Sequence, residues 1–156
     1  MKRKLKAIGY WKSIFEPEFP DPINFEDSNW NVKDKELVLE HLGRGKSIAD
    51  WMGISWCRYR CGEKDMGASC MSDGVYIFPE KLSHYLEHHH VRLPDEFVEH
   101  IKTYEPVKIL SNRSQYTIDY DWWKQQQGFN NHVTSKSYLA ATDEELIRFE
   151  KRKTTN

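Results

Sequence analysis

The segment 57–94 concentrates the side chains of this chain that commonly bind metals. It contains all three cysteines and four of the seven histidines, namely Cys57, Cys61, Cys70, His84, His88, His89 and His90. Two cysteines separated by three residues, followed by a histidine pair on a short helix, are typical of a tetrahedral zinc site with two thiolate and two imidazole ligands. We therefore predict a zinc ion bound by Cys57, Cys61, His84 and one further histidine.

The position of the second histidine depends on the shape of the helix that carries it. On an ideal helix, residues four apart diverge by about 40° and residues five apart by about 140°. This geometry favours His88 as the partner of His84. His89 becomes available if the helix tightens or unwinds at its end. We expect Cys70 to be buried outside the site, although it could replace one of the four ligands.

Four protein ligands would leave the zinc ion no open position for a substrate, so such an ion stabilises a fold. If water replaced one ligand, the ion could instead activate that water, and the protein would be a zinc-dependent hydrolase. A third interpretation involves no metal: the cysteines are small buried residues, and the histidines form a solvated helix end.

The same segment resembles a known family. The residues that carry the resemblance are Cys57-Arg58, Cys61-Gly62, Met66-Gly67, Asp73-Gly74-x-Tyr76, Pro79-Glu80-x-Leu82-x-His84-Tyr85, His89-x-Val91-Arg92-Leu93-Pro94 and Glu96-Phe97. This pattern is similar to that of a family of small bacterial proteins of uncharacterised activity, and it covers about a quarter of the chain. The chain departs from the family pattern at Phe78, where the family has Trp, and at Lys81, where it has Gly. The resemblance implies that His89 completes the ligand set, and it implies no activity.

Composition limits the remaining possibilities. The chain has 156 residues, which fits a single domain, here taken as 1–156, that can bury a core without disulfides. Its 23 basic residues nearly balance its 24 acidic residues, so charge disfavours a finger-like nucleic-acid-binding module. The sequence contains no signal peptide pattern and no apolar run of membrane-spanning length. An odd number of cysteines without a secretion signal favours a cytoplasmic location.

The pattern of turn residues and apolar residues predicts one α+β domain with short antiparallel strands, several helices and a zinc-stabilised hairpin-helix unit at about 54–94. Predicted strands cover 6–11, 54–61, 75–78 and 115–120, and predicted helices cover 34–42, 79–90, 94–104, 121–127 and a segment after Thr142. Asn31 or Asp34 could cap the first helix. Asp73-Gly74 is a hairpin turn signal, and the tail 152–156 is expected to fray.

The segment 16–29 is predicted to be a long loop because prolines interrupt it. Loops of this kind often carry function. Its acidic and aromatic composition, with a second such cluster at 119–123, suits a basic protein partner such as a nuclease toxin. The hypothesis is a non-enzymatic protein, of the immunity or regulator type, that binds its partner through Phe19, Asp21, Asp119 and Trp122. The alternative is that the aromatic rings pack into the core.

Overall fold

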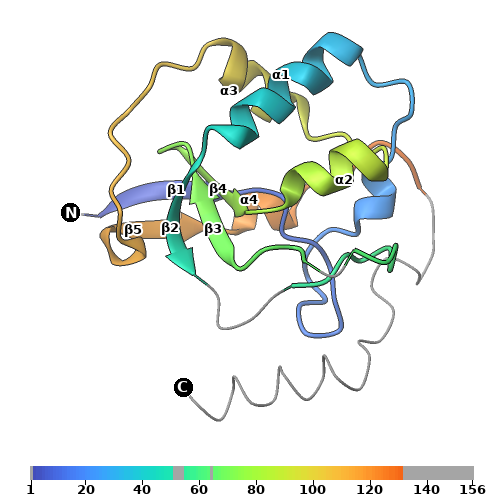
Figure 1. The fold of residues 1–156 in the computed structure, drawn as a ribbon, viewed down its shortest axis with the longest axis horizontal. Helices are drawn as coiled ribbons and strands as arrows, with labels where there is room; N and C mark the ends of the chain where they lie inside the picture. Colours follow the sequence, from blue (N-terminus) through green and yellow to red (C-terminus); the bar gives the residue numbers. More distant parts are fainter. Residues whose placement is uncertain (1, 51–54, 64, 132–156) are drawn as a thin grey trace.

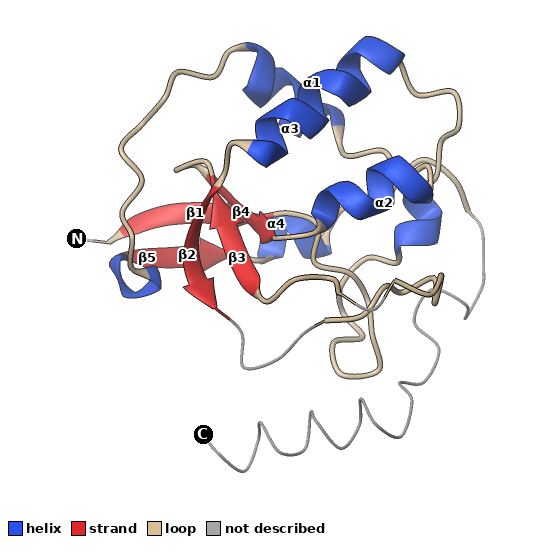
Figure 2. Ribbon diagram, in the orientation of Figure 1, coloured by secondary structure: helices blue, strands red, loops and turns tan. Residues whose placement is uncertain are grey.

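The computed structural model describes residues 2–50, 55–63 and 65–131 (Figure 1). In this part of the chain, one five-stranded mixed sheet packs with helices, which confirms the predicted α+β class (Figure 2). Helices α1 and α3 contact each other, and α1 also contacts α2. The predicted helix after Thr142 and the tail 152–156 lie outside the described residues.

The sheet has the strand order β2-β3-β4-β1-β5. Its strands are β1 (Arg3–Ala7), β2 (Lys46–Asp50), β3 (Ser69–Ser72), β4 (Tyr76–Pro79) and β5 (Tyr116–Asp119). The pairs β2–β3 and β3–β4 are antiparallel, the expected orientation, although β2 and β3 themselves were not predicted as strands. By contrast, β1 is parallel to both β4 and β5. Parallel neighbours need a long crossover connection, and residues 8–75 provide one between β1 and β4. The expectation of antiparallel strands was therefore wrong for β1.

The hairpin of β3 and β4 has the predicted turn at Asp73-Gly74. One carboxylate oxygen of Asp73 accepts hydrogen bonds from the amides of Val75 and Tyr76, at 2.8 and 2.7 Å. Gly74 has a φ of +95°, a backbone conformation that glycine adopts without steric cost. The turn is thus fixed by its own side chain and by the absence of a Cβ atom.

The helices begin and end close to the predicted positions. They are α1 (Val32–Gly43), α2 (Leu82–His88), α3 (Asp95–Lys102) and α4 (Asp121–Lys124), with 3₁₀ turns η1 (Pro22–Phe25) and η2 (Arg113–Gln115). The Asn31 side chain caps α1 by accepting a hydrogen bond from the amide of Asp34 at 3.0 Å, as predicted. Helix α2 starts later than predicted because Pro79 still pairs with Cys70 as the last residue of β4.

The predicted strand 54–61 does not form in residues 55–61. This segment instead turns tightly, with the amide of Arg60 donating to the carbonyl oxygen of Cys57 at 3.0 Å. An isolated apolar and aromatic run has no intrinsic preference for a strand when no neighbouring strand is available to pair with it. The turn brings Cys57 and Cys61 back toward the same side of the loop.

The core lies between the sheet, the helices and the loop that follows β1. Trp11 makes edge contacts with Phe25 and Trp123 at ring-centroid distances of 5.3 and 5.2 Å. Phe19 and Trp30 are also buried, so aromatic rings at both ends of the proline-containing loop pack into the core. None of the described helices combines the length and the apolar character needed to cross a membrane.

Candidate metal centre

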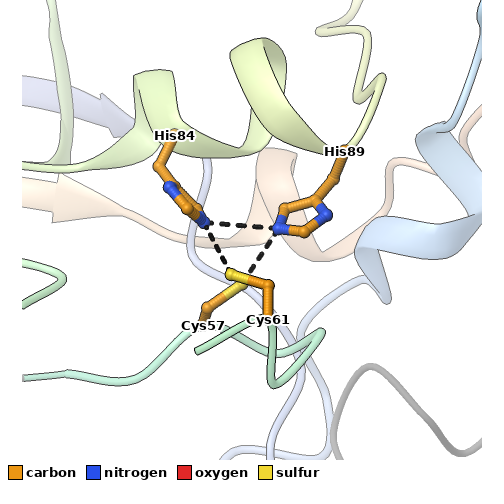
Figure 3. Close-up of side chains that lie close together, drawn as sticks. All are labelled: Cys57, Cys61, His84 and His89. Carbon is orange, nitrogen blue, oxygen red and sulfur yellow. Dashed lines mark hydrogen bonds between the residues drawn. The ribbon is translucent and has the colours of Figure 1, made fainter. Parts of the chain in front are cut away.

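The loop 57–61, the first turn of α2 and the residue that follows α2 bring four metal-binding side chains together (Figure 3). The Sγ atom of Cys57 lies 3.3 Å from Nε2 of His89, and the Sγ atom of Cys61 lies 3.3 Å from Nε2 of His84. The two Nε2 atoms are also 3.3 Å apart. All four ligand atoms lie within 4.8 Å of one another. The predicted set of Cys57, Cys61, His84 and His89 therefore forms one cluster.

The dimensions of this cluster match a tetrahedral zinc site. Zn–N bonds of about 2.05 Å and Zn–S bonds of about 2.3 Å place neighbouring ligand atoms roughly 3.3 to 3.8 Å apart. The measured N–N separation of 3.3 Å falls in this range, and the S–N separations of 3.3 Å are about 0.2 Å shorter than the roughly 3.5 Å of such a pair. The four atoms therefore lie close enough together to bind one metal ion.

His89 can join His84 because α2 ends between them. The last helical residue is His88, and His89 has non-helical dihedral angles of φ −130° and ψ 12°. His90 follows in the left-handed region with a φ of +57°. This unwinding turns the imidazole of His89 toward His84, whereas His88 is exposed and outside the cluster. The histidine that lies in the cluster is thus His89, which the family resemblance implies, and not His88, which ideal helix geometry favours.

Aromatic and basic residues hold the ligands in position. The ring of Tyr59 stacks on the imidazole of His89, with 4.2 Å between centroids and an angle of 8° between planes. The Tyr85 hydroxyl accepts a hydrogen bond from the amide of Arg58 at 3.0 Å. Such contacts around a metal site orient its ligands.

Arg58 is buried, and its guanidinium donates to the backbone carbonyl oxygens of Trp11, Lys12 and Trp56. In the sequence, the nearby acidic residues Glu63 and Asp65 are typical of an exposed, solvated charge pattern and give no sign of this burial. The one signal that could have identified it was its place beside Cys57 in the family pattern. Arg58 fixes the path of the loop that presents both cysteines.

Burial shifts the pKa values of three of the four candidate ligands. It raises the pKa of the Cys57 thiol to about 11 and lowers the pKa of His89 to about 4, with the neighbouring His84 adding to the effect. Burial also lowers the pKa of His84. The imidazoles are therefore neutral and have lone pairs for a metal. The thiol needs a nearby cation to ionise, and a bound divalent ion would provide that charge.

Cys70 does not belong to this cluster. It is buried on β3, as expected, and its Sγ atom lies 3.3 Å from the hydroxyl of Tyr10, which donates to it. None of the three cysteines, all of which the structure describes, forms a disulfide.

The residues predicted to bind a partner all make contacts within the protein. The ring of Phe19 is 7% exposed and packs against Tyr10 and Tyr120. Asp21 caps η1 through the amide of Ile23 at 3.1 Å. Phe19 therefore leaves little free surface for a partner, whereas Asp21 is half-buried.

The second predicted partner-binding segment, 119–123, also makes contacts within the protein. Asp119 accepts hydrogen bonds from the amides of Asp121 and Trp122 at the start of α4. The half-buried ring of Trp122 lies 5.7 Å from the ring of Tyr76 and 5.1 Å from the ammonium of Lys6. Because Phe19 contacts Tyr120, the two clusters meet around this tyrosine.

No protein-family model, no curated protein and no solved structure matched the chain.

Proposed function

We propose that the chain binds one zinc ion through Cys57, Cys61, His84 and His89, and that this ion is structural. The observation that carries the proposal is the convergence of two thiols and two imidazoles at separations close to those of a tetrahedral zinc site. Soft thiolates together with imidazoles favour zinc over magnesium or calcium.

A structural role fits the surroundings better than a catalytic one. Every position of a tetrahedral ion would be taken by protein, so a hydrolytic water would have to displace a ligand. Cys57 is 2% exposed and Tyr59 covers His89. The ion would instead join the loop 55–63, which has no regular secondary structure, to both ends of α2. This arrangement supports the non-enzymatic interpretation over the zinc-dependent hydrolase.

Elemental analysis and native mass spectrometry of protein purified without added metal test the proposal. The expected result is one zinc per chain, with Cys57 and Cys61 protected from thiol reagents until a chelator is added. X-ray absorption at the zinc edge should give two sulfur and two nitrogen neighbours. Sub-stoichiometric zinc with freely reactive cysteines would reject the metal, and an oxygen neighbour in place of one protein ligand would favour the hydrolase.

We also propose that the protein acts by binding a basic protein in a reducing compartment such as the cytoplasm, as an immunity protein or a regulator would. Cysteines without a disulfide support the compartment. In the loop after β1, Glu16 and Glu18 are exposed acidic residues, although burial of its carboxyl group raises the pKa of Glu16 and the Glu18 carboxylate lies 3.9 Å from the ammonium of Lys124. As exposed residues they are better placed for contact than Phe19 or Asp21.

Charge reversal tests the partner proposal. A double variant with Glu16→Lys and Glu18→Lys should lose a basic partner that wild type captures from the native lysate. A control with Glu36→Lys and Glu40→Lys reverses two exposed charges on α1 and should retain it. Equal capture by all three proteins would contradict the assignment of this loop.

A further inference from the structure

Three side chains from separate elements form a second cluster, away from the four-ligand site. His41 lies near the end of α1, Asp73 in the β3–β4 turn and His100 on α3. The same carboxylate oxygen, Oδ2 of Asp73, lies 2.7 Å from Nε2 of His41 and 2.8 Å from Nε2 of His100. All three ligand atoms lie within 4.8 Å of one another. The proposed function uses none of them.

The Asp73 carboxylate is fixed in its orientation. It is 3% exposed, and its other oxygen, Oδ1, accepts hydrogen bonds from the turn amides of Val75 and Tyr76. The backbone carbonyl of Asp73 accepts a hydrogen bond from the hydroxyl of Tyr104 at 2.5 Å. These bonds leave Oδ2 directed at the two imidazoles, in the way that neighbouring contacts orient a metal-binding carboxylate.

A buried carboxylate oxygen that lies between two imidazole nitrogens is an arrangement in which proteins also hold metal ions.

The cluster borders a cleft of about 420 Å³. His41, Asp73 and Tyr104 contribute to its wall, with the basic side chains of Arg44 and Lys46 close by. A metal bound at the cluster could therefore keep coordination positions open toward the cleft, for water or a small anion.

We propose that His41, Asp73 and His100 form a second site, for a divalent transition-metal ion, independent of the four-ligand centre. Two imidazoles and one carboxylate are ligands that zinc, manganese, iron, cobalt and nickel ions accept. Bonds of about 2.1 Å at right angles place ligand atoms about 3.0 Å apart. The measured N–O distances of 2.7 and 2.8 Å are only slightly shorter.

The competing interpretation is a hydrogen-bonded cluster that stabilises the turn. It requires a proton on Nε2 of both His41 and His100, since Asp73 can only accept. Metal binding requires the opposite tautomer, with Nε2 free to coordinate and the proton on Nδ1. Metal stoichiometry and histidine nitrogen chemical shifts separate the two.

The test is a titration of purified protein with Zn²⁺, Co²⁺ and Mn²⁺, followed by native mass spectrometry. Wild type should bind a second equivalent of at least one ion, whereas Asp73→Asn and His100→Gln should each bind one fewer. The side-chain amide oxygen of the Asp73→Asn variant could still accept the turn amides. Glu40→Gln removes a carboxylate from the wall of the same cleft and should retain the wild-type stoichiometry.

Protection of Cys57 and Cys61 from a thiol reagent reports the first site separately, so failure at one site is distinguishable from failure at the other. Circular dichroism establishes that each variant is folded, and His100→Gln decides the question if Asp73→Asn does not fold. The proposal is overturned if wild type takes up no ion beyond the thiol-protecting one. It is also overturned if the second equivalent persists in folded His100→Gln.

Discussion

Cys57 and Cys61 offer the same ligand atom to the candidate metal centre from different surroundings. Cys57 is buried, and Cys61 is exposed at the edge of the loop. Burial keeps the thiol of Cys57 protonated unless a cation is nearby. The buried ligand thus depends most strongly on the metal, and the exposed one is the first accessible to a thiol reagent after metal loss.

Replacing the buried ligand should destabilise the protein much more than replacing a buried cysteine elsewhere. Cys57→Ser should lower the free energy of unfolding by about 4 kcal/mol or more, because loss of a structural metal belongs to the largest class of single-residue effects. Cys70→Ser makes the same chemical change on β3 and should cost about 1 kcal/mol. Urea unfolding followed by circular dichroism measures both. Equal losses would contradict a structural metal at Cys57.

The choice between adjacent histidines gives a second test. His89→Gln should weaken zinc binding by more than about 100-fold, because a ligand contributes more than the surrounding contacts whose loss costs roughly 10- to 100-fold. His88→Gln should leave it unchanged, since His88 lies outside the cluster. Competition with a colorimetric zinc chelator measures the affinity of each variant. The reverse order would show that the helix end rewinds around the ion.

At the scale of elements, the β3–β4 turn depends on Gly74. A Cβ atom there would collide with Cγ2 of Val107. Gly62 has almost the same φ, +97° against +95°, but a Cβ atom at Gly62 would meet nothing within 4 Å. A comparison of alanine substitutions at these two glycines therefore distinguishes the cost of backbone strain from the cost of a steric clash.

Gly74→Ala should lower the free energy of unfolding by about 2 to 4 kcal/mol, through backbone strain together with overpacking against a branched side chain. Gly62→Ala should cost only the strain, about 1 kcal/mol. Thermal unfolding measures both, with zinc content determined alongside because Gly62 follows a ligand. If the two variants lost similar amounts of unfolding free energy, the side chain of Val107 would have to move away from the added methyl group at no energetic cost.

The features that sequence predicts well are local ones. The Asn31 cap and the Asp73-Gly74 turn each depend on a side chain and amides only a few residues away. The parallel pairing of β1 depends on strands far along the chain, and no local pattern encodes it. The apolar run at 54–61 predicts a strand, yet residues 55–61 form a turn in which Arg58 bonds to the backbone of Trp11, Lys12 and Trp56.

The four-ligand centre and the cluster of His41, Asp73 and His100 also differ in how far the sequence predicts them. The four-ligand centre has a recognisable spacing of cysteines and histidines, and only the choice of His89 needed the unwound helix end. His41, Asp73 and His100 have no characteristic spacing, since packing of α1 and α3 near the hairpin turn brings them together. Asp73 was interpreted correctly as a turn residue, but that role concealed its contact with two imidazoles.

At the scale of the whole molecule, the candidate zinc ion would connect regions that no strand pairing in the sheet holds together. The loop 55–63 contributes no strand to the sheet, and the other two ligands are His84 on α2 and His89 directly after it (Figure 3). Trp11 and Lys12, which follow β1, accept hydrogen bonds from Arg58 beside the first ligand. An ion at this point would couple the loop, the helix and the chain that leaves β1.

Removal of zinc should therefore lower the stability of the whole domain. Because about 4 kcal/mol corresponds to a shift of roughly 10 °C in a protein of this size, a strong chelator should lower the melting temperature of wild type by about 10 °C. Added zinc should restore it. Differential scanning calorimetry with and without chelator measures the shift, and Cys57→Ser is the control, since its melting temperature should already be low and respond little to the chelator. An unchanged melting temperature in wild type after verified loss of zinc would show that the ion does not stabilise the fold.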